Sequence, residues 1–273
     1  MAKGYDININ NLRFTPPKGN EKGILRGISF TVTSGEFVSF IGRNGHGKTS
    51  IFKAILGELN RHHIEGEIKV GNTVINKSIH ELCGGVGIVH QYVQDDLIPE
   101  LTILKNIQIR MANSTNKEVR KNAFEEDWKQ QLNAILADFL KTDDFTPTND
   151  QLIENLSGGQ RQLLNILISI KFEHSSTIGC KLLLLDEHLT SLDKVIQKKV
   201  MELVMKLTGR NPENNPENKP ENKPTILMIT HDFEYALQYS NSIIVVYEGV
   251  VKERIEKSDR SKWTTGYLNK VIE

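Results

Sequence analysis

The sequence predicts an α/β protein with a central parallel sheet, an antiparallel sheet at its N-terminal side and an inserted helical segment. Residues 36–41 form a short β-type run, and a glycine-rich turn separates them from the helix-like spacing of residues 50–56. Residues 181–187 are continuously apolar up to two carboxylates, which is typical of a strand covered on both faces. Residues 5–14 and 24–32 alternate apolar and polar side chains, as half-buried antiparallel strands do.

Length and composition limit the classes of protein that fit. A chain of 273 residues has room for one large α/β domain or two smaller ones. Its 34 basic residues balance 34 acidic ones, so bulk charge gives no reason to expect a nucleic-acid partner. Cys83 and Cys180 lie far apart, and the N-terminus shows no secretory leader, so we expect a cytosolic protein without disulfides. No stretch reaches the roughly 18 apolar residues of a membrane span. If the protein works at a membrane, the membrane-spanning helices must therefore come from a partner.

The glycine-rich turn, Gly42–Thr49, fits the pattern G-x-x-x-x-G-K-[ST]. Such a loop aims backbone N–H groups at phosphate oxygens, and the N-terminus of the following helix adds its positive dipole end. Lys48 is expected to reach the β- and γ-phosphates, and the Thr49 hydroxyl to coordinate Mg²⁺. A chance match in a flexible loop is the alternative, and the strand before and the helix after the turn argue against it. The predicted contacts to the phosphates are Gly42, Arg43, Asn44, Gly45, His46, Gly47, Lys48, Thr49 and Ser50.

The segments between these motifs predict a mixture of strands and helices. Residues 65–76 predict two short strands around a turn dipeptide, and residues 86–89 predict a strand that ends at His90-Gln91. Residues 103–172 predict mainly helix, and the apolar stripe within 116–140 is typical of core packing. Phe14, at the end of the first strand, either stacks on a nucleotide base or packs at the edge of the sheet.

Asp186 and Glu187 stand at the carboxyl end of the predicted central strand. Open α/β sheets bind ligands at that end of their strands, which favours a chemical role. A solvated acidic cap is the alternative for any such pair. The phosphate loop earlier in the chain makes the chemical role the better interpretation.

Residues 211–224 repeat a tetrapeptide with proline at every fourth position. Proline blocks helix and sheet hydrogen bonds, and no residue of the repeat is apolar enough to offset the cost of ordering. We expect a disordered surface loop, a tolerated insertion rather than a partner-binding segment. A strand at 225–230 and a helix to about 239 follow, and residues 242–273 predict a hairpin and a short helix.

The motif Leu156-Ser-Gly-Gly-Gln160 lies between the phosphate loop and the acidic strand and is specific to one family. With it, the chain resembles the ATP-binding subunit of ATP-binding-cassette (ABC) transporters over nearly its whole length. The resemblance implies a P-loop NTPase with a RecA-like core, an N-terminal antiparallel β subdomain and a helical subdomain at about 92–171. Residues 1–273 would then form a single ABC ATPase domain.

The resemblance also implies a role for each matching residue. Asp186 would hold Mg²⁺ through water, Glu187 would be the general base, and Gln91 would touch both the metal and the water. His231 would contact the γ-phosphate. The physical demands of hydrolysis agree, since charge must be neutralised on the γ-phosphoryl group and a water must be oriented in line. A carboxylate beside another carboxylate also gains affinity for protons, which suits a base.

A second anion site is predicted where residues 160–171 begin a helix, because helix N-termini favour negative charge. One chain already has a phosphate loop, so the extra site implies two subunits that meet head to tail and close over two ATP molecules. The resemblance adds a D-loop at 191–193 and gives Phe14 the place of the adenine-stacking aromatic. The further predicted contacts to nucleotide are Phe14, Ser157, Gly158, Gly159, Gln160 and Asp193.

The departures from the family pattern are few. His46 replaces a small residue, and His188 stands where proline is commonest. Residues 186–193 resemble a subset of subunits that work with amino-acid-type binding proteins. We therefore expect the ATPase subunit of an importer of a small solute such as an amino acid, on the cytoplasmic face of the cell membrane. An exporter subunit, a soluble ABC protein of translation or DNA repair, and a regulatory module without turnover are the alternatives.

The expected cofactors are ATP and Mg²⁺. The expected partners are an integral-membrane transporter subunit, a second copy of the ATP-binding subunit and an upstream substrate-binding protein. Residues 91–107 would form part of the face that receives the transporter's coupling helix. The soluble ABC protein fits less well, because such relatives usually carry two cassettes or a long coiled coil. The regulatory module also fits less well, because it would not need the full set of Lys48, Asp186, Glu187 and His231.

Overall fold

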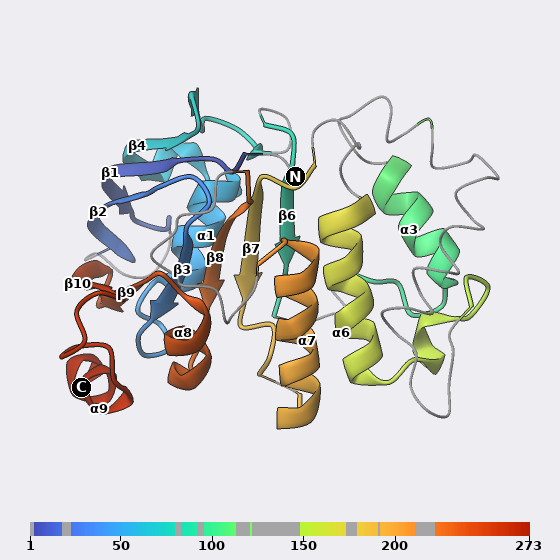
Figure 1. Cartoon of the computed structure of the whole chain (residues 1–273). Coiled ribbons are helices and arrows are strands. Elements are labelled where there is room, and N and C mark those ends of the chain that lie inside the picture. Colours follow the sequence, from blue (N-terminus) through green and yellow to red (C-terminus); the bar gives the residue numbers. More distant parts are fainter. Residues whose placement is uncertain are drawn as a thin grey trace.

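The computed structural model contains two sheets flanked by helices (Figure 1). It describes residues 3–17, 23–79, 83–91, 96–112, 121, 148–172, 179–190, 192–210 and 222–273. Several predictions concern residues outside these ranges: nearly all of the stripe in 116–140, Ser191 of the D-loop, and residues 211–221 of the repeat.

The smaller sheet is antiparallel, as the alternating pattern predicts. Its strands are β1 (Ile7–Phe14), β2 (Leu25–Val32), β4 (Ile64–Val70) and β5 (Thr73–Val74), in the order β2-β1-β4-β5. Ile7, Ile9 and Leu12 of β1 are buried, whereas Asn8 and Asn10 are exposed. The register shifts between Ile9 and Leu12, and this bulge brings Leu12 and Phe14 onto the buried face.

The larger sheet has the order β10-β9-β3-β8-β7-β6. Neighbouring strands from β9 to β6 are parallel, and only the edge pair of β9 and β10 is antiparallel. The strands are β3 (Phe37–Ile41), β6 (Val86–Val89), β7 (Leu182–Asp186), β8 (Thr225–Ile229), β9 (Ser242–Tyr247) and β10 (Val250–Glu256).

The four leucines of β7 show why this strand is apolar throughout. Leu183 and Leu185 pack into a core on one face of the sheet, and Leu182 and Leu184 pack into a second core on the other face. A strand covered on both faces has no side for polar residues until its end. The predicted central strand is therefore confirmed, and its polar residues begin at Asp186.

Helices cover both faces of the larger sheet. α1 (Lys48–Leu56) packs between the two sheets, and α7 (Lys194–Leu207) covers the opposite face. α8 (Phe233–Tyr239) and α9 (Thr265–Ile272) pack against β9 and β10. Short 3-10 helices occur at Arg61–His63 and Ile153–Asn155.

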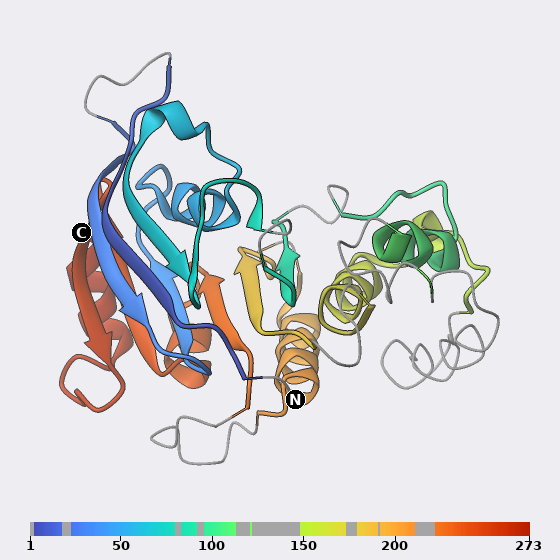
Figure 2. The ribbon, with the colours of Figure 1, turned by 90° about the horizontal axis from the view of Figure 1, so that it is seen from above.

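α3 (Ile103–Ala112) and α6 (Gly158–Leu167) form a helical unit beside α7. Figure 2 shows these two helices on the side of the molecule opposite to β1 and β2. α6 continues into a π-helix at Ile168–Phe172. No helix within the described ranges is long and apolar enough to cross a bilayer.

Candidate active site

Four neighbouring parallel strands end at one edge of the larger sheet and carry the predicted polar side chains there. β3 leads into the glycine loop, β8 into His231, β7 into Asp186 and Glu187, and β6 into Gln91. Because parallel strands point the same way, their carboxyl ends lie side by side, which is where ligands of open α/β sheets bind. The topology thus gathers residues that lie up to 183 positions apart, from Lys48 to His231.

The glycine loop turns sharply between β3 and α1. Gly42 has φ 148°, and a Cβ there would lie 2.2 Å from the Val246 carbonyl oxygen, so only glycine fits against β9. Gly47 is the N-cap of α1 with φ 98°, which directs the first N–H groups of the helix into the loop. Lys48 Nζ donates to the carbonyl oxygens of Gly42 (2.8 Å) and Arg43 (3.1 Å). The loop therefore holds an ammonium and unpaired helix N–H groups together, the donors that bind phosphate.

A hollow of about 350 Å³ opens at this loop. Its size lies in the usual range of small-molecule sites, roughly 300–1,000 Å³. Side chains from β6 and β7 complete the wall that the loop begins. The lining residues are Ile24, Asn44, Gly45, Gly47, Lys48, Thr49, Ser50, Gln91 and Glu187.

The charged groups in and beside the hollow influence one another. Burial raises the pKa of the Asp186 carboxyl, and the nearby charge of Glu187 raises it further. Burial lowers the pKa of the Lys48 ammonium, and the charges of Glu187 and Asp186 oppose that shift. The two carboxylates and the ammonium thus form one electrostatic unit at the sheet edge.

Hard oxygen donors stand beside this unit. The Thr49 hydroxyl lies 3.5 Å from Asp186 Oδ1, and Gln91 lines the same hollow with a carboxamide. Hydroxyl, carboxylate and carboxamide oxygens are the ligands that Mg²⁺ prefers, and Mg²⁺ keeps several waters in such sites. The residues present therefore fit a magnesium ion.

The Glu187 carboxylate is held from two sides. His231 Nε2 lies 2.9 Å from Glu187 Oε1, and Gln91 Nε2 donates to Glu187 Oε2 at 3.1 Å. The Glu187 backbone has φ 45°, in the left-handed region that costs a non-glycine residue about 1–3 kcal/mol. Such strain is typical of functional positions, where the surroundings fix a side chain in one direction. This geometry can orient a water for attack on a phosphoryl group.

The residues of the motif 156–160 lie at the start of α6. Ser157 Oγ accepts from the Gln160 N–H at 3.2 Å, and Gln160 Oε1 accepts from the Ser157 N–H at 2.9 Å, which is a capping box. A Cβ at Gly159 would lie 2.6 Å from Ile196 Cγ2 of α7, whereas a Cβ at Gly158 would meet no heavy atom within 4 Å. Gly159 is thus required for helix packing, and Gly158 leaves its side of the helix start open.

Several predicted contacts do not line the hollow as the described residues form it. Ser157, Gly158, Gly159 and Gln160 contribute nothing to its wall, and Asp193 instead caps α7 by accepting from the N–H groups of Val195 and Ile196. Gly42, Arg43 and His46 belong to the loop but are not among the residues that line the hollow. In one copy of the chain, none of these residues lines the hollow.

Phe14 does not offer a free ring face to a base. Its side chain is 8% exposed and belongs to the core between the two sheets. The bulge in β1 turns Phe14 inward with Leu12, as described above. The stacking role has no support from this geometry, and edge packing describes Phe14 better.

His46 has a structural explanation that the sequence did not offer. Its ring packs edge-on against Tyr247, with the ring centroids 5.0 Å apart, and its carbonyl oxygen accepts from the Gly249 N–H at 3.1 Å. The glycine loop is therefore braced against the β9–β10 hairpin. Tyr247 could not be assigned this role from the sequence, because nothing local to the loop reveals which strand lies beside it.

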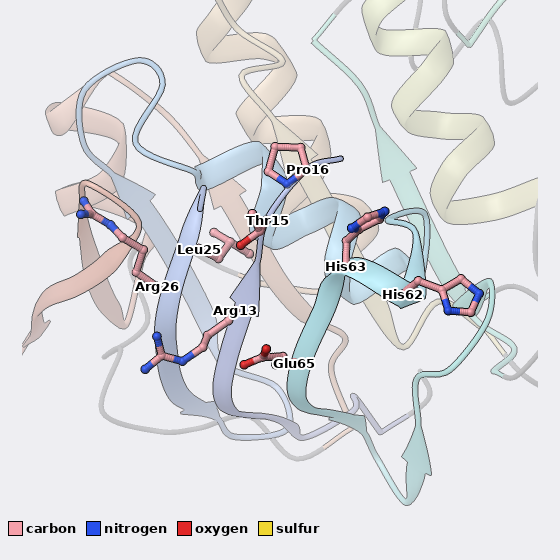
Figure 3. Close-up of a pocket in the computed structure, with 8 residues that line it drawn as sticks. All are labelled: Arg13, Thr15, Pro16, Leu25, Arg26, His62, His63 and Glu65. Carbon is pink, nitrogen blue, oxygen red and sulfur yellow. The ribbon is translucent and has the colours of Figure 1, made fainter. Parts of the chain in front are cut away.

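A second hollow, of about 410 Å³, lies on the smaller sheet and is shown in Figure 3. Arg13 and Arg26 point to one side of it and His62 to the other. Arg26 is already paired with Glu248 at 3.0 Å. The polar groups of this second hollow do not converge, so we take the hollow at the glycine loop as the candidate site.

The phosphate loop, the acidic strand end and the polar side chains around them define a P-loop nucleotide-binding protein. The family model described as ABC transporter matches residues 25–190, more than half of the chain. The chain therefore belongs to the ABC transporter family, as its motifs predict. It is an ATP-binding subunit of that family, an ATPase with the P-loop fold of ABC nucleotide-binding domains.

Curated relatives are of moderate similarity. A tyrosine transport ATP-binding protein of Clostridioides difficile is 28% identical over 94% of this chain and 95% of its own length. A spermidine/putrescine import ATP-binding protein of Mycoplasma mycoides is 26% identical over 96% of this chain. The chain spans 66% of the length of that second relative.

Solved structures agree in fold. A nucleotide-free ATP-binding cassette from an ABC transporter matches with a TM-score of 0.71 and 21% identity, over 98% of each chain. A dimeric, post-hydrolysis ATP-binding cassette bound to ADP and Pi matches with a TM-score of 0.68 and 23% identity, over 92% of this chain and 98% of that chain. At these identities the likeness shows the fold alone.

Proposed function

We propose that the hollow at the glycine loop binds ATP with Mg²⁺ and that Glu187 is the general base of hydrolysis. The N–H groups of the loop and Lys48 hold the phosphates, and Thr49, Gln91 and Asp186 hold the metal. When bound, Mg²⁺ supplies positive charge beside the β- and γ-phosphates. His231 stabilises charge on the γ-phosphoryl group.

One observation carries the assignment of the base. The Glu187 carboxylate is fixed by Gln91 and His231, from the two strands that flank its own in the sheet, and it lines the same hollow as Lys48. A general base must be held within hydrogen-bonding reach of its proton donor, and this carboxylate is the group so held. The geometry therefore supports water activation at Glu187.

The start of α6 supports a proposal about assembly. Residues 157–160 do not line the hollow of their own chain, and the space around Gly158 is open. We propose that this helix start closes on the glycine loop of a second copy, with its N–H groups toward the phosphates. The matched cassette bound to ADP and Pi is described as dimeric, which agrees with such an assembly.

The names of these two relatives support an importer. Tyrosine transport and spermidine/putrescine import both concern small, nitrogen-containing solutes. We propose that this chain drives import of an amino-acid-like solute, together with an integral-membrane subunit and a substrate-binding protein. It would then work at the cytoplasmic face of the membrane, with residues 91–107 in the docking face.

The nucleotide site is tested with Lys48→Ala. Loss of the ammonium removes the charge that faces the β- and γ-phosphates, so we expect nucleotide binding to disappear in a titration with a fluorescent ATP analogue. Circular dichroism and the thermal unfolding midpoint serve as controls for folding. Unchanged nucleotide affinity in a folded Lys48→Ala protein would remove the phosphate-loop assignment.

The transport role is tested in membranes of the organism from which the sequence comes. A tagged Glu187→Gln chain is expected to copurify with an integral-membrane protein that stimulates the ATPase of the wild-type chain after reconstitution into vesicles. Radiolabelled amino acids and polyamines then identify the solute and its direction. Copurification with ribosomes or DNA-repair proteins instead would favour the soluble alternative.

A further inference from the structure

Asp96 is a buried carboxylate that lies outside the hollow and that no motif singles out. Its side chain is 1% exposed. Four donor groups reach it: the His90 N–H at 3.1 Å, His90 Nδ1 at 2.7 Å, Arg110 Nη1 at 3.3 Å and Asn165 Nδ2 at 2.7 Å. A buried carboxylate with this many partners fixes the positions of all of them.

The donors come from three separate parts of the fold. His90 directly precedes Gln91 at the end of β6, Arg110 is in α3, and Asn165 is in α6. Asp96 therefore bridges the edge of the larger sheet and both helices of the helical unit. The helix α6 that it reaches is the one that begins beside Ser157.

A second link runs parallel to the first. Arg110 Nη2 donates to Ser169 Oγ at 3.5 Å, and Ser169 Oγ donates to the Ile88 carbonyl oxygen at 2.8 Å. Ile88 lies in β6 itself, two residues before His90. The sheet edge is thus tied to the helical unit at two successive points, and Arg110 takes part in both.

Asp96 stays ionised in this setting. Burial alone would raise the pKa of the carboxyl, but the hydrogen bond from His90, the charges of His90 and Arg110, and the hydrogen bond from Asn165 together hold the pKa below its ordinary value. An ionised carboxylate accepts stronger hydrogen bonds than a neutral amide would. The bridge is accordingly stiff where it meets the His90 backbone.

We propose that Asp96 is a positioning residue for Gln91. It fixes the backbone and ring of His90 to α3 and α6, so that the Gln91 carboxamide, which contacts Glu187 at 3.1 Å, keeps its place relative to the helical unit. Movement of α6 is then transmitted to the hollow through Asp96. This inference rests on the role proposed above for Gln91.

Asp96→Asn is the first test. The amide keeps the shape but presents an NH₂ group to donors that need an acceptor, so the link to His90 or to Asn165 is lost. We expect kcat for ATP hydrolysis to fall by about tenfold, since misplacement of about 1 Å near a reacting centre costs up to about 100-fold. Affinity for a non-hydrolysable ATP analogue should stay within about twofold, because the phosphate loop is unchanged.

A double-mutant cycle separates positioning from a general loss of structure. If Asp96 acts through Gln91, adding Asp96→Asn to Gln91→Ala lowers kcat by less than about twofold further. An equal fold-loss in both backgrounds would overturn the inference and leave the role of Gln91 intact. If Gln91→Ala alone leaves kcat unchanged, the proposed role of Gln91 falls, and the inference falls with it.

Glu36→Gln is the matched control for stability. Glu36 is also a buried carboxylate, 2% exposed, which accepts from the Thr33 N–H, the Ser242 hydroxyl and Arg254, but it lies at the start of β3, away from the hollow. We expect both variants to lower the thermal unfolding midpoint and only Asp96→Asn to lower kcat. A matching loss of kcat in Glu36→Gln would reduce Asp96 to a structural residue.

Asn165→Ala gives a second route should Asp96→Asn fold poorly. It removes only the tie between Asp96 and α6, and it deletes a buried carbonyl oxygen that has no partner among the described residues. We expect a smaller fall in kcat that again vanishes in the Gln91→Ala background. Full kcat in a folded Asn165→Ala protein would show that α6 does not act on Gln91 through Asp96.

Discussion

The imidazole Nε2 of His231 lies 2.9 Å from Oε1 of Glu187, so the histidine that follows β8 orients the carboxylate that follows β7. The two strands are neighbours in the sheet, with Asp186 paired to Ile229. The contact therefore depends on parallel strand pairing rather than on any flexible loop. It gives the proposed base a hydrogen-bonding partner from the neighbouring strand.

Glu187→Gln should keep this contact and lose the base. The carboxamide has the same shape and can still bond to His231 and Gln91, but it cannot take a proton from water. We expect ATP affinity to be retained, turnover to fall by about 100- to 10,000-fold, and a closed dimer to accumulate with ATP. Phosphate release and light scattering measure the two effects, and hydrolysis at the wild-type rate would refute the assignment.

The two glycines that open α6 form a matched pair. Gly158→Ala should leave the unfolding free energy nearly unchanged, because its new methyl group meets open space. Gly159→Ala should lower it by about 1–3 kcal/mol, because its methyl group would lie 2.6 Å from Ile196 Cγ2. Urea denaturation measures both values.

Measurements of dimerisation and turnover then separate a role of the α6 surface in assembly from its role in helix packing. If the open side of Gly158 receives the nucleotide of a second copy, Gly158→Ala weakens ATP-driven dimerisation and turnover at full stability. Sedimentation with and without ATP in the Glu187→Gln background gives the dimer fraction. Normal dimerisation of the Gly158→Ala protein would oppose the head-to-tail arrangement.

Residues 212–221 are expected to be dispensable, and the residues around them give a reason. Arg210 Nη2 donates to the carbonyl oxygens of Gly35 at 2.8 Å and Pro224 at 2.7 Å, and the guanidinium lies over the Phe37 ring. These contacts hold both ends of the segment without its help. Replacing residues 212–221 by Gly-Ser-Gly should leave ATPase activity within about twofold.

Arg210→Ala is the contrast to that deletion. It leaves two buried carbonyl oxygens without this donor, so we expect a loss of about 1–3 kcal/mol in unfolding free energy. Thermal unfolding of the two variants side by side measures the difference. A deletion variant less stable than Arg210→Ala would show that the repeat itself supports the fold.

Local motifs made much of the site predictable. Gly42–Thr49, Asp186 and Glu187 are each defined by a short pattern next to a strand, and parallel strand ends meet at one edge whatever the strand order. The sequence could not reveal that β4 pairs with β1, because this pairing joins residues 50 to 63 positions apart. Long-range pairing depends on packing that no local pattern records.

Two residues show why other details escaped the sequence. Phe14 turned out buried because the bulge in β1 sets which side chains face the core, and alternation alone did not decide between its two readings. Asp96 escaped because its partners come from β6, α3 and α6, up to 69 positions away. A buried polar network is recognised only when the elements that supply its donors are in place.

His188 directly follows the proposed base and supplies a test that depends on pH. His188 is 3% exposed, and neither ring nitrogen has a hydrogen-bond partner among the residues that the structure describes. Burial lowers the pKa of His188 to about 3, against about 6.5 for a histidine in water. Folded protein therefore keeps this ring neutral at a pH where the unfolded chain protonates it.

The sign of the effect follows from proton linkage. Between about pH 6.5 and pH 3 the unfolded state binds one more proton at His188, so acid lowers stability, by up to about 1.4 kcal/mol per pH unit. His188→Leu removes that proton uptake and two buried nitrogens that no described residue bonds to. We expect its stability relative to wild type to rise as the pH falls from 6 to 4, at an unchanged denaturant m-value. Urea titrations at each pH provide the measurement, and parallel curves for the two proteins would show that His188 is not held neutral by the fold.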